Sequence, residues 1–259
     1  MAQEERIIIT PPKGSFPLRG FRYSAAHPCY GVDREGRLIC RENDRLRGGW
    51  LYLRRGGLWD GLRRSEGLCR DLLRECAARS FCGVLLDGPC GSLLRWEEEL
   101  TVHGLRLLVP ESCAGLVDRA GVYLSSALSG GCLEDRLKAG LDRFGPERLT
   151  LLLEQAAEDF FLPAPTGCGK PLTQEELNNL RERLEPCVFF SPPLCARYFT
   201  YMSQESGAHF VLFDDRDTMA RKLERARAAG VRSFLLPSPA VAAALPLTAA
   251  GDRGKIGPS

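Results

Sequence analysis

The sequence predicts an α/β protein, a compact (β/α)8 TIM-like barrel with a small α+β hairpin insertion before the last helix and strand. Short apolar runs alternate with amphipathic stretches along most of the 259 residues, and repeated strand–helix–strand units imply a parallel sheet. Roughly eight strands can be counted, and a chain of ~250 residues suits one barrel. An open doubly wound sheet is the alternative. It would suggest a nucleotide site, but no glycine loop of the GxGxxG or GxxxxGK type occurs.

Apolar runs and helical periodicity place the individual elements. Segment 81–87 is almost entirely apolar, as expected of a strand buried on both faces of a parallel sheet. Leucines recur at helical spacing in 65–79, and Thr173 with Glu176 forms a capping box that begins another helix. The expected strands are 7–9, 30–40 (two strands around a turn), 50–53, 81–87, 105–109, 121–124, 149–153 and 231–236, and the expected helices are 65–79, 93–103, 132–144, 173–184 and 217–229.

The last third of the chain contains the insertion. Segments 198–202 and 209–213 flank the sequence SQESG, which is typical of a hairpin turn. We expect a single barrel domain over 1–241, with the insertion at about 163–216. Beyond it the chain is rich in Ala, Pro and Gly, so 242–259 is expected to be a disordered tail.

The charge of the chain is nearly balanced. There are 35 Lys and Arg residues against 33 Asp and Glu, a net charge of +2, and the two signs are interspersed. Such a surface gives no general attraction to nucleic acid or anionic lipid, so neither is expected as a partner. No stretch approaches the ~20 apolar residues of a membrane span, and the N-terminus MAQEERIIIT lacks the apolar core of a signal peptide. These features favour a cytoplasmic location.

The eleven cysteines are odd in number and spread along the chain, with no CxxC pair of zinc spacing. Several lie in apolar stretches, where a thiol behaves as a small hydrophobic residue. The three histidines, His27, His103 and His209, have no Cys or carboxylate at metal spacing and are interpreted as structural. Cys82 or Cys90 as a nucleophile would need a His base, and none lies nearby in sequence. We expect no metal and no cofactor.

Two blocks of sequence carry a family resemblance. In the first, 199–237, a hairpin ends in Phe213-Asp214-Asp215, a helix carries Lys222-Leu223 before Gly230, and a final strand follows. This block resembles the end of glycoside hydrolase family 18, in particular its spore-associated, peptidoglycan-cleaving branch. In the second, 68–87 is similar to the helix and fourth strand of that family. The resemblance implies a barrel of the same fold, and a spore-associated location joins the cytoplasmic one as an expectation.

The resemblance also implies a chemistry and the residues that perform it. In the family, a glutamic acid after strand four protonates the glycosidic oxygen, and a neighbouring Asp holds the substrate's N-acetyl group, which itself attacks the anomeric carbon. This differs from the usual pair of carboxylates. The acid position falls on Pro89, which has no proton to give, and earlier motif Asp positions fall on Cys82 and Leu85. The Asp beside the acid is retained as Asp87.

Other family positions are also altered. The sixth-strand Met-x-Tyr-Asp run is replaced by Tyr123-Leu124-Ser125-Ser126, and Leu235-Leu236-Pro237 stands where the family has a Trp under the sugar. The resemblance implies that a glycan would contact Asp87, Tyr123 and Ser125. Trp59, in the loop after strand three, is the aromatic candidate for a sugar contact.

Two glutamates could replace the missing acid. Glu111 follows the fifth strand and Glu154 ends the seventh, so both are expected at the barrel mouth, where barrel active sites are built. Either could pair with Asp87, although a hydrogen-bonded rim residue is the simpler interpretation of each.

Three functions are considered for a protein with these residues. The first is a non-catalytic family 18-like barrel that binds an N-acetyl sugar polymer of the peptidoglycan or chitin type, or a protein partner, in spore or envelope assembly. The second is an active glycosidase that uses Asp87 with Glu111 or Glu154. The third, a barrel enzyme for a phosphorylated metabolite, would need a glycine-rich phosphate loop after strand seven or eight, and it is disfavoured because 234–239 lacks glycine. Ligand identity and oligomeric state are left open.

Overall fold

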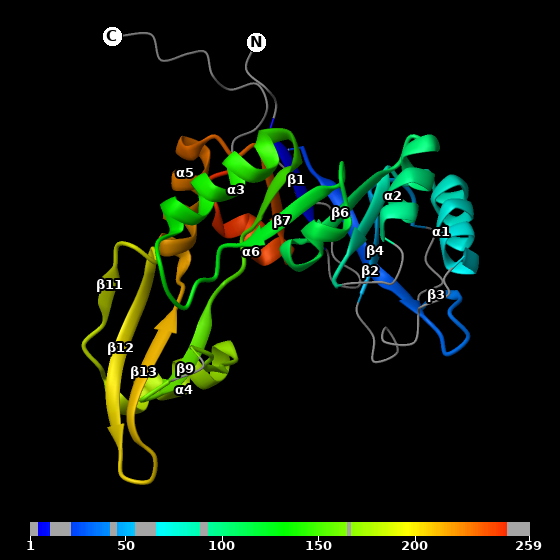
Figure 1. Cartoon of the computed structure of the whole chain (residues 1–259). Coiled ribbons are helices and arrows are strands. Elements are labelled where there is room, and N and C mark those ends of the chain that lie inside the picture. Colours follow the sequence, from blue (N-terminus) through cyan, green and yellow to red (C-terminus); the bar gives the residue numbers. More distant parts are fainter. Residues whose placement is uncertain are drawn as a thin grey trace, which may run out of the picture.

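The computed structural model describes residues 5–10, 22–41, 46–54, 66–88, 93–164 and 167–247. It has two parts (Figure 1), a barrel with its helices and an antiparallel sheet that projects from one side of the barrel. Among the described residues, no helix is both long and apolar enough to cross a membrane.

Eight parallel strands form a closed barrel. β1 pairs with both β14 and β2, which joins the two edges of the sheet. The expected (β/α)8 barrel is therefore confirmed. In order around the barrel the strands are β1 (Arg6–Ile9), β2 (Ser24–Val32), β4 (Trp50–Leu53), β5 (Gly83–Leu86), β6 (Arg106–Pro110), β7 (Gly121–Ser125), β8 (Leu149–Leu152) and β14 (Ser233–Leu236).

Helices cover the outside of the barrel. Figure 1 shows α1 and α2 on one side and α3 and α5 on the other. Every residue of β5 and β14 is buried, as expected of parallel strands that lie between a helical layer and a filled interior. The helices are α1 (Glu66–Arg79), α2 (Leu93–Val102), the 3-10 helix η2 (Glu111–Leu116), α3 (Leu133–Arg148), α5 (Arg216–Ala229) and α6 (Pro239–Ala244), and the short strand β3 (Leu38–Cys40) pairs antiparallel with β2.

The interior of the barrel is filled by side chains from different strands. Six of them form a buried cluster: Ile8, Ala26, Trp50, Leu85, Leu108 and Leu235. Tyr52, Tyr123 and Leu152 pack against this cluster. Because side chains alternate along a strand, a residue two positions beyond an interior residue also faces the interior, nearer the C-terminal end.

The insertion lies between β8 and α5. Its sheet has the order β10-β9-β13-β12-β11, and Leu177 of its helix packs on Phe199, Val211 and Phe213 of one sheet face. The expected capping box of Thr173 and Glu176 begins this helix. The elements are β9 (Ala157–Phe161), β10 (Lys170–Pro171), α4 (Gln174–Leu184), β11 (Phe189–Ser191), β12 (Ala196–Ser203) and β13 (Gly207–Phe213).

The C-terminal segment is more ordered than its composition suggests. Ser238 caps α6 by accepting a hydrogen bond from the amide of Val241, and Ala242 and Leu245 are buried in the core. The described chain thus continues to Leu247, past the boundary expected at residue 241. Apolar burial outweighs the tendency of an Ala- and Pro-rich stretch to be disordered.

Candidate functional site at the barrel mouth

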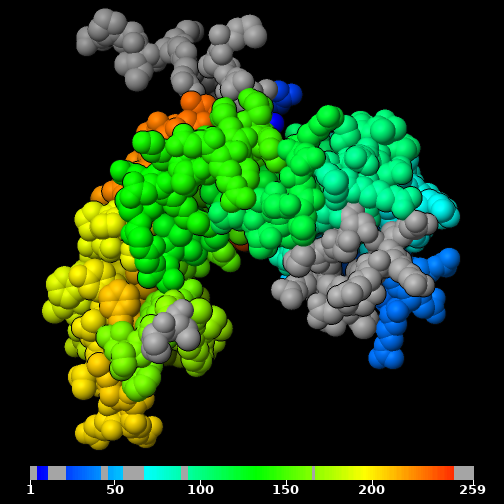
Figure 2. All heavy atoms as spheres, viewed as in Figure 1, coloured from blue at the N-terminus to red at the C-terminus, as the bar shows by residue number. Residues whose placement is uncertain are grey.

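The C-terminal ends of the barrel strands face a concave surface. The insertion follows β8 and the β2–β3 turn follows β2, so both emerge from this end of the barrel. In Figure 2 they project from opposite sides of the barrel, and the surface between them is hollowed. This end of a barrel is where active sites are built.

Strand alternation brings three of the expected residues to this mouth. Asp87 lies two positions beyond Leu85, Ser125 two beyond Tyr123, and Glu154 two beyond Leu152, and all three reference residues belong to the barrel interior. Ser125 therefore faces the mouth from β7. Asp87 and Glu154, which follow β5 and β8, join the same group through Tyr52 and Ser125 respectively.

Asp87 lies close to two tyrosines of the barrel interior. Burial raises the pKa of Tyr52, and the charge of Asp87, to which it is hydrogen-bonded, raises that pKa further. The pKa of Tyr123 is also raised, first by burial and then by the charge of Asp87. The Tyr123 hydroxyl donates to the carbonyl oxygen of Leu86 at 3.0 Å. Both hydroxyls therefore stay protonated at neutral pH beside a carboxylate.

Two serines at the C-terminal end of β7 hydrogen-bond to Glu154, which follows the neighbouring strand β8. The Ser125 hydroxyl donates to Glu154 Oε2 at 2.8 Å, and the Ser126 hydroxyl donates to the Glu154 carbonyl oxygen at 3.3 Å. The charge of Glu154 also contributes to the raised pKa of Tyr52 and of Tyr123. The mouth thus combines two carboxylates with hydroxyl donors.

Glu111 lies elsewhere on the rim. It is the first residue of η2, and its Oε2 lies 2.6 Å from Arg136 Nη2 on α3, with both side chains partly exposed. Its carboxylate is therefore directed to the helical layer. Pro89, Cys90 and Trp59 lie outside the described residues. Leu85 lies within β5 as expected, whereas Cys82, expected inside the strand, lies immediately before it.

Tyr52 was missed by the sequence interpretation. The signal was the alternation Trp50-Leu51-Tyr52-Leu53, which places the two aromatic residues on one side of the strand. Its direction could be assigned only after β4 was known to lie beside β5, where Tyr52 pairs with Leu85.

The histidines have local partners. His209 Nδ1 lies 2.9 Å from Asp159 Oδ1, and its ring stacks on Tyr201 at 4.5 Å. His27 Nε2 lies 3.1 Å from the Gly48 carbonyl oxygen, and His103 Nδ1 lies 2.9 Å from that of Glu99. Within the described residues, no three His, Cys, Asp or Glu side chains gather as a metal site would require.

Comparison with known proteins identifies the fold. A chitinase from Chromobacterium violaceum superposes with a TM-score of 0.65 over 92% of this chain and 97% of its own, at 14% identity. The chain has the barrel fold of the chitinases. The Bacillus cereus spore cortex-lytic enzyme SleL gives a TM-score of 0.64 over 91% of this chain and 70% of its own, at 12% identity.

A third structure contains a bound sugar. A mutant of a class V chitinase from Nicotiana tobaccum, in complex with NAG4, gives a TM-score of 0.59 over 90% of this chain and 93% of its own, at 13% identity. These likenesses agree with the fold expected from the family 18 resemblance. No protein-family model and no curated protein sequence matches the chain.

Proposed function

We propose that this chain is a family 18-like barrel that binds an N-acetylated glycan, of the chitin or peptidoglycan type, at its C-terminal mouth without cleaving it. The observation that carries the proposal is the position of Asp87, which is hydrogen-bonded to Tyr52 and lies close enough to Tyr123 to act on it electrostatically. The pair of tyrosines and the carboxylate offer donors and an acceptor to a sugar substituent.

The chemistry of an acetamido group fits this arrangement. Its N–H can donate to the Asp87 carboxylate, and its carbonyl oxygen can accept from the Tyr123 hydroxyl in place of the Leu86 carbonyl oxygen. The raised pKa of both tyrosines keeps these donors protonated. The NAG4 complex of the tobacco chitinase supports this ligand class, because that protein has the same fold.

The absence of hydrolysis follows from the acid position. General acid catalysis requires a proton held at the glycosidic oxygen, and on the family resemblance the acid position falls on Pro89. Glu154, the other carboxylate of the mouth, accepts a hydrogen bond from the Ser125 hydroxyl at 2.8 Å, which holds its side chain against β7. The mouth would therefore bind a glycan without cleaving its glycosidic bond.

A second candidate is an active glycosidase in which Glu154 and Asp87 act together. It is favoured by one observation, namely that both carboxylates act electrostatically on the same two tyrosines. Glu111 is the weaker partner, since Arg136 neutralises it on the helical side of the rim.

The test is isothermal titration of the chain with N-acetylglucosamine tetrasaccharide, together with Asp87→Asn. We expect wild-type binding and about a tenfold loss of affinity in the variant, since a charge-assisted hydrogen bond is removed. The matched control is Asp142→Asn, on the exposed side of α3, which should bind as wild type does. No binding by wild type, or equal binding by both variants, would contradict the proposal.

For the biological setting, we propose spore or envelope assembly, with a protein partner as the alternative ligand at the mouth. The support is the fold shared with the spore cortex-lytic enzymes. Retention on purified peptidoglycan sacculi, abolished by Asp87→Asn, tests the glycan role. If the chain neither sediments with sacculi nor binds the tetrasaccharide, the glycan role is contradicted and the protein partner is the ligand that is left.

A further inference from the structure

A cavity of about 690 Å³ opens at the N-terminal end of the barrel, opposite the mouth. Its lining comes from the beginnings of the strands, including Arg6, Ser24, Arg106, Gly121 and Ser233. Asp87, Ser125 and Glu154 are not among the lining residues. The cavity is therefore separate from the candidate glycan site.

Small side chains leave this end of the barrel hollow. Barrel interiors are normally filled by layers of bulky side chains. Here Ser24, Gly121 and Ser233 lie at the corresponding level, two positions before or directly beside residues of the interior cluster. The floor of the cavity is apolar, because it includes Ile8 and Leu108 of the interior cluster.

The acids that line the cavity already have partners. Glu97 accepts hydrogen bonds from the amides of Asp118, at 2.8 Å, and Arg119, at 2.6 Å. Glu5 makes a two-pronged pair with Arg227 at 2.6 and 2.9 Å, and Glu147 pairs with Arg6 at 3.5 Å. These hydrogen bonds and ion pairs offset the negative charge of the three glutamates in the cavity wall.

Several arginines of the lining are not neutralised by a carboxylate of the described chain. In the described part of the chain, Arg106, Arg119 and Arg148 make no ion pair with a carboxylate. Arg148 donates from Nε to the Ala120 carbonyl oxygen at 2.9 Å, and Arg106 reaches only the weak acceptor Cys82 Sγ at 3.5 Å. The cavity therefore has an excess of positive charge.

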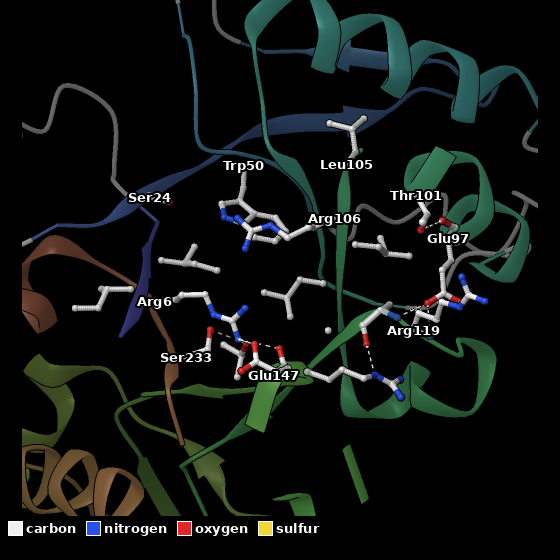
Figure 3. A pocket seen from close by; sticks show the side chains of 18 of the residues that line it. Arg6, Ser24, Trp50, Glu97, Thr101, Leu105, Arg106, Arg119, Glu147 and Ser233 are labelled. Atoms are coloured by element: carbon white, nitrogen blue, oxygen red, sulfur yellow. Dashed lines mark hydrogen bonds and ion pairs between the residues drawn. The ribbon is translucent and has the colours of Figure 1, made fainter. Parts of the chain in front are cut away.

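Trp50 provides a second, independent indication of a ligand. Its side chain is only 4% exposed, and Nε1 has no hydrogen-bond acceptor among the described residues. Buried donors are normally satisfied, so such a group calls for a partner. The Arg106 guanidinium lies over the indole, 4.7 Å from the ring centroid (Figure 3), with Arg6 and Ser233 across the cavity.

We propose that this cavity binds a small organic oxyanion, a molecule with a phosphate or carboxylate group. The oxyanion would accept hydrogen bonds from Arg106 and, once that guanidinium turns from the indole to the ligand, from the buried Trp50 Nε1. Its organic part would lie on Ile8 and Leu108. The volume lies within the ~300–1,000 Å³ of small-molecule sites and exceeds what a bare ion needs. Arginine is the side chain best suited to forked contacts with such groups.

The test is titration calorimetry with inorganic pyrophosphate and, separately, citrate, at constant ionic strength set with chloride. The two probes distinguish a phosphate from a carboxylate ligand. We expect one of them to bind, and its Kd to rise about tenfold in Arg106→Gln, because a charged donor is lost. The same loss is expected in Trp50→Phe, which removes the indole N–H.

The matched control is Arg74→Gln on α1, whose side chain is 74% exposed and outside the cavity. It should bind the probe as wild type does. Arg106 is itself exposed, so its replacement preserves the fold, and circular dichroism checks this. Absence of binding for both probes at millimolar concentration, or an equal Kd in Arg106→Gln and Arg74→Gln, would overturn the proposal.

Discussion

Lys222 Nζ lies 2.6 Å from Asp214 Oδ2, and neither side chain has any solvent exposure. The carboxylate also accepts hydrogen bonds from the Ala156 amide and the Thr218 hydroxyl, at 2.8 and 2.9 Å. In turn, the Asp214 amide donates to the Ala156 carbonyl oxygen at 2.8 Å. The chain leaves the barrel at Ala156 and returns at Asp214, so this group fixes both ends of the insertion at the mouth.

Replacing the buried cation should destabilise the whole protein. In Lys222→Met, the Asp214 carboxylate is left buried without its cation, and we expect a loss of about 3–5 kcal/mol in the free energy of unfolding. Urea denaturation measures it. Lys138→Met, at an exposed position of α3, should stay within about 0.5 kcal/mol of wild type.

A double-variant cycle separates the pair from simple loss of packing. In an Asp214→Asn background, Lys222→Met should cost less than in wild type, because no buried charge is then left without a partner. An equal cost in the two backgrounds would show that the ion pair does not couple the residues.

Asp215, next along the chain, should make stability depend on acid pH. Burial disfavours its charged form, but hydrogen bonds from the Thr218 amide and from Arg197 outweigh burial, so its pKa lies below the ordinary value. A depressed folded pKa adds stability above the unfolded value of about 3.9, and this is lost as pH falls through the folded pKa. Asp215→Asn should therefore be less stable than wild type at pH ~7. The difference in their free energies of unfolding should shrink below pH ~4.

Denaturation at a series of pH values checks this prediction. Asp142→Asn, which changes an exposed Asp on α3, should show no such narrowing. If the difference in the free energy of unfolding between wild type and Asp215→Asn stays constant from neutral to acid pH, the charge of Asp215 is not its source.

Two glycine substitutions should act in opposite directions. A Cβ on Gly83 would collide with the Arg106 carbonyl oxygen and lie 2.8 Å from Trp50 Cζ3, so Gly83→Ala should cost about 1–3 kcal/mol by overpacking. Gly67 is helical with open space around it, and Gly67→Ala should stabilise by about 0.5 kcal/mol. Thermal unfolding gives both signs, and a stabilised Gly83→Ala would refute the close packing of Trp50.

Tyr52→Phe should weaken glycan binding at the mouth. The hydroxyl hydrogen-bonded to Asp87 is lost while the ring that packs in the barrel is kept, and we expect about a threefold to tenfold rise in Kd for the tetrasaccharide. Tyr198→Phe, on the insertion sheet, is the matched control. Unchanged affinity in Tyr52→Phe would remove this hydroxyl from the site.

The sequence was sufficient for the barrel because its signals are local. The apolar run 81–87, the strand 50–53 and the capping box at Thr173 each depend on neighbouring residues, and the structure contains a strand or helix at each place. Asp87 and Glu154 could be expected at the mouth for the same reason, since each lies within two residues of the end of a strand.

Features that depend on contacts between distant strands could not be predicted. Lys222 looks like a surface residue on a polar helix, and only the return of the chain at Asp214 accounts for its burial. The cavity beneath Trp50 collects arginines from β1, β6 and α3, which no sequence spacing relates. Tyr52 became a site residue only through the neighbouring strand that carries Asp87.

Binding without cleavage is tested most directly by mass spectrometry of N-acetylglucosamine tetrasaccharide incubated with wild-type chain at a concentration that saturates the mouth, as established by calorimetry. We predict that the tetrasaccharide is recovered intact. Shorter oligosaccharides that appear with wild type and with Glu98→Gln, an exposed control on α2, but not with Glu154→Gln, would show an active glycosidase and contradict the non-catalytic barrel.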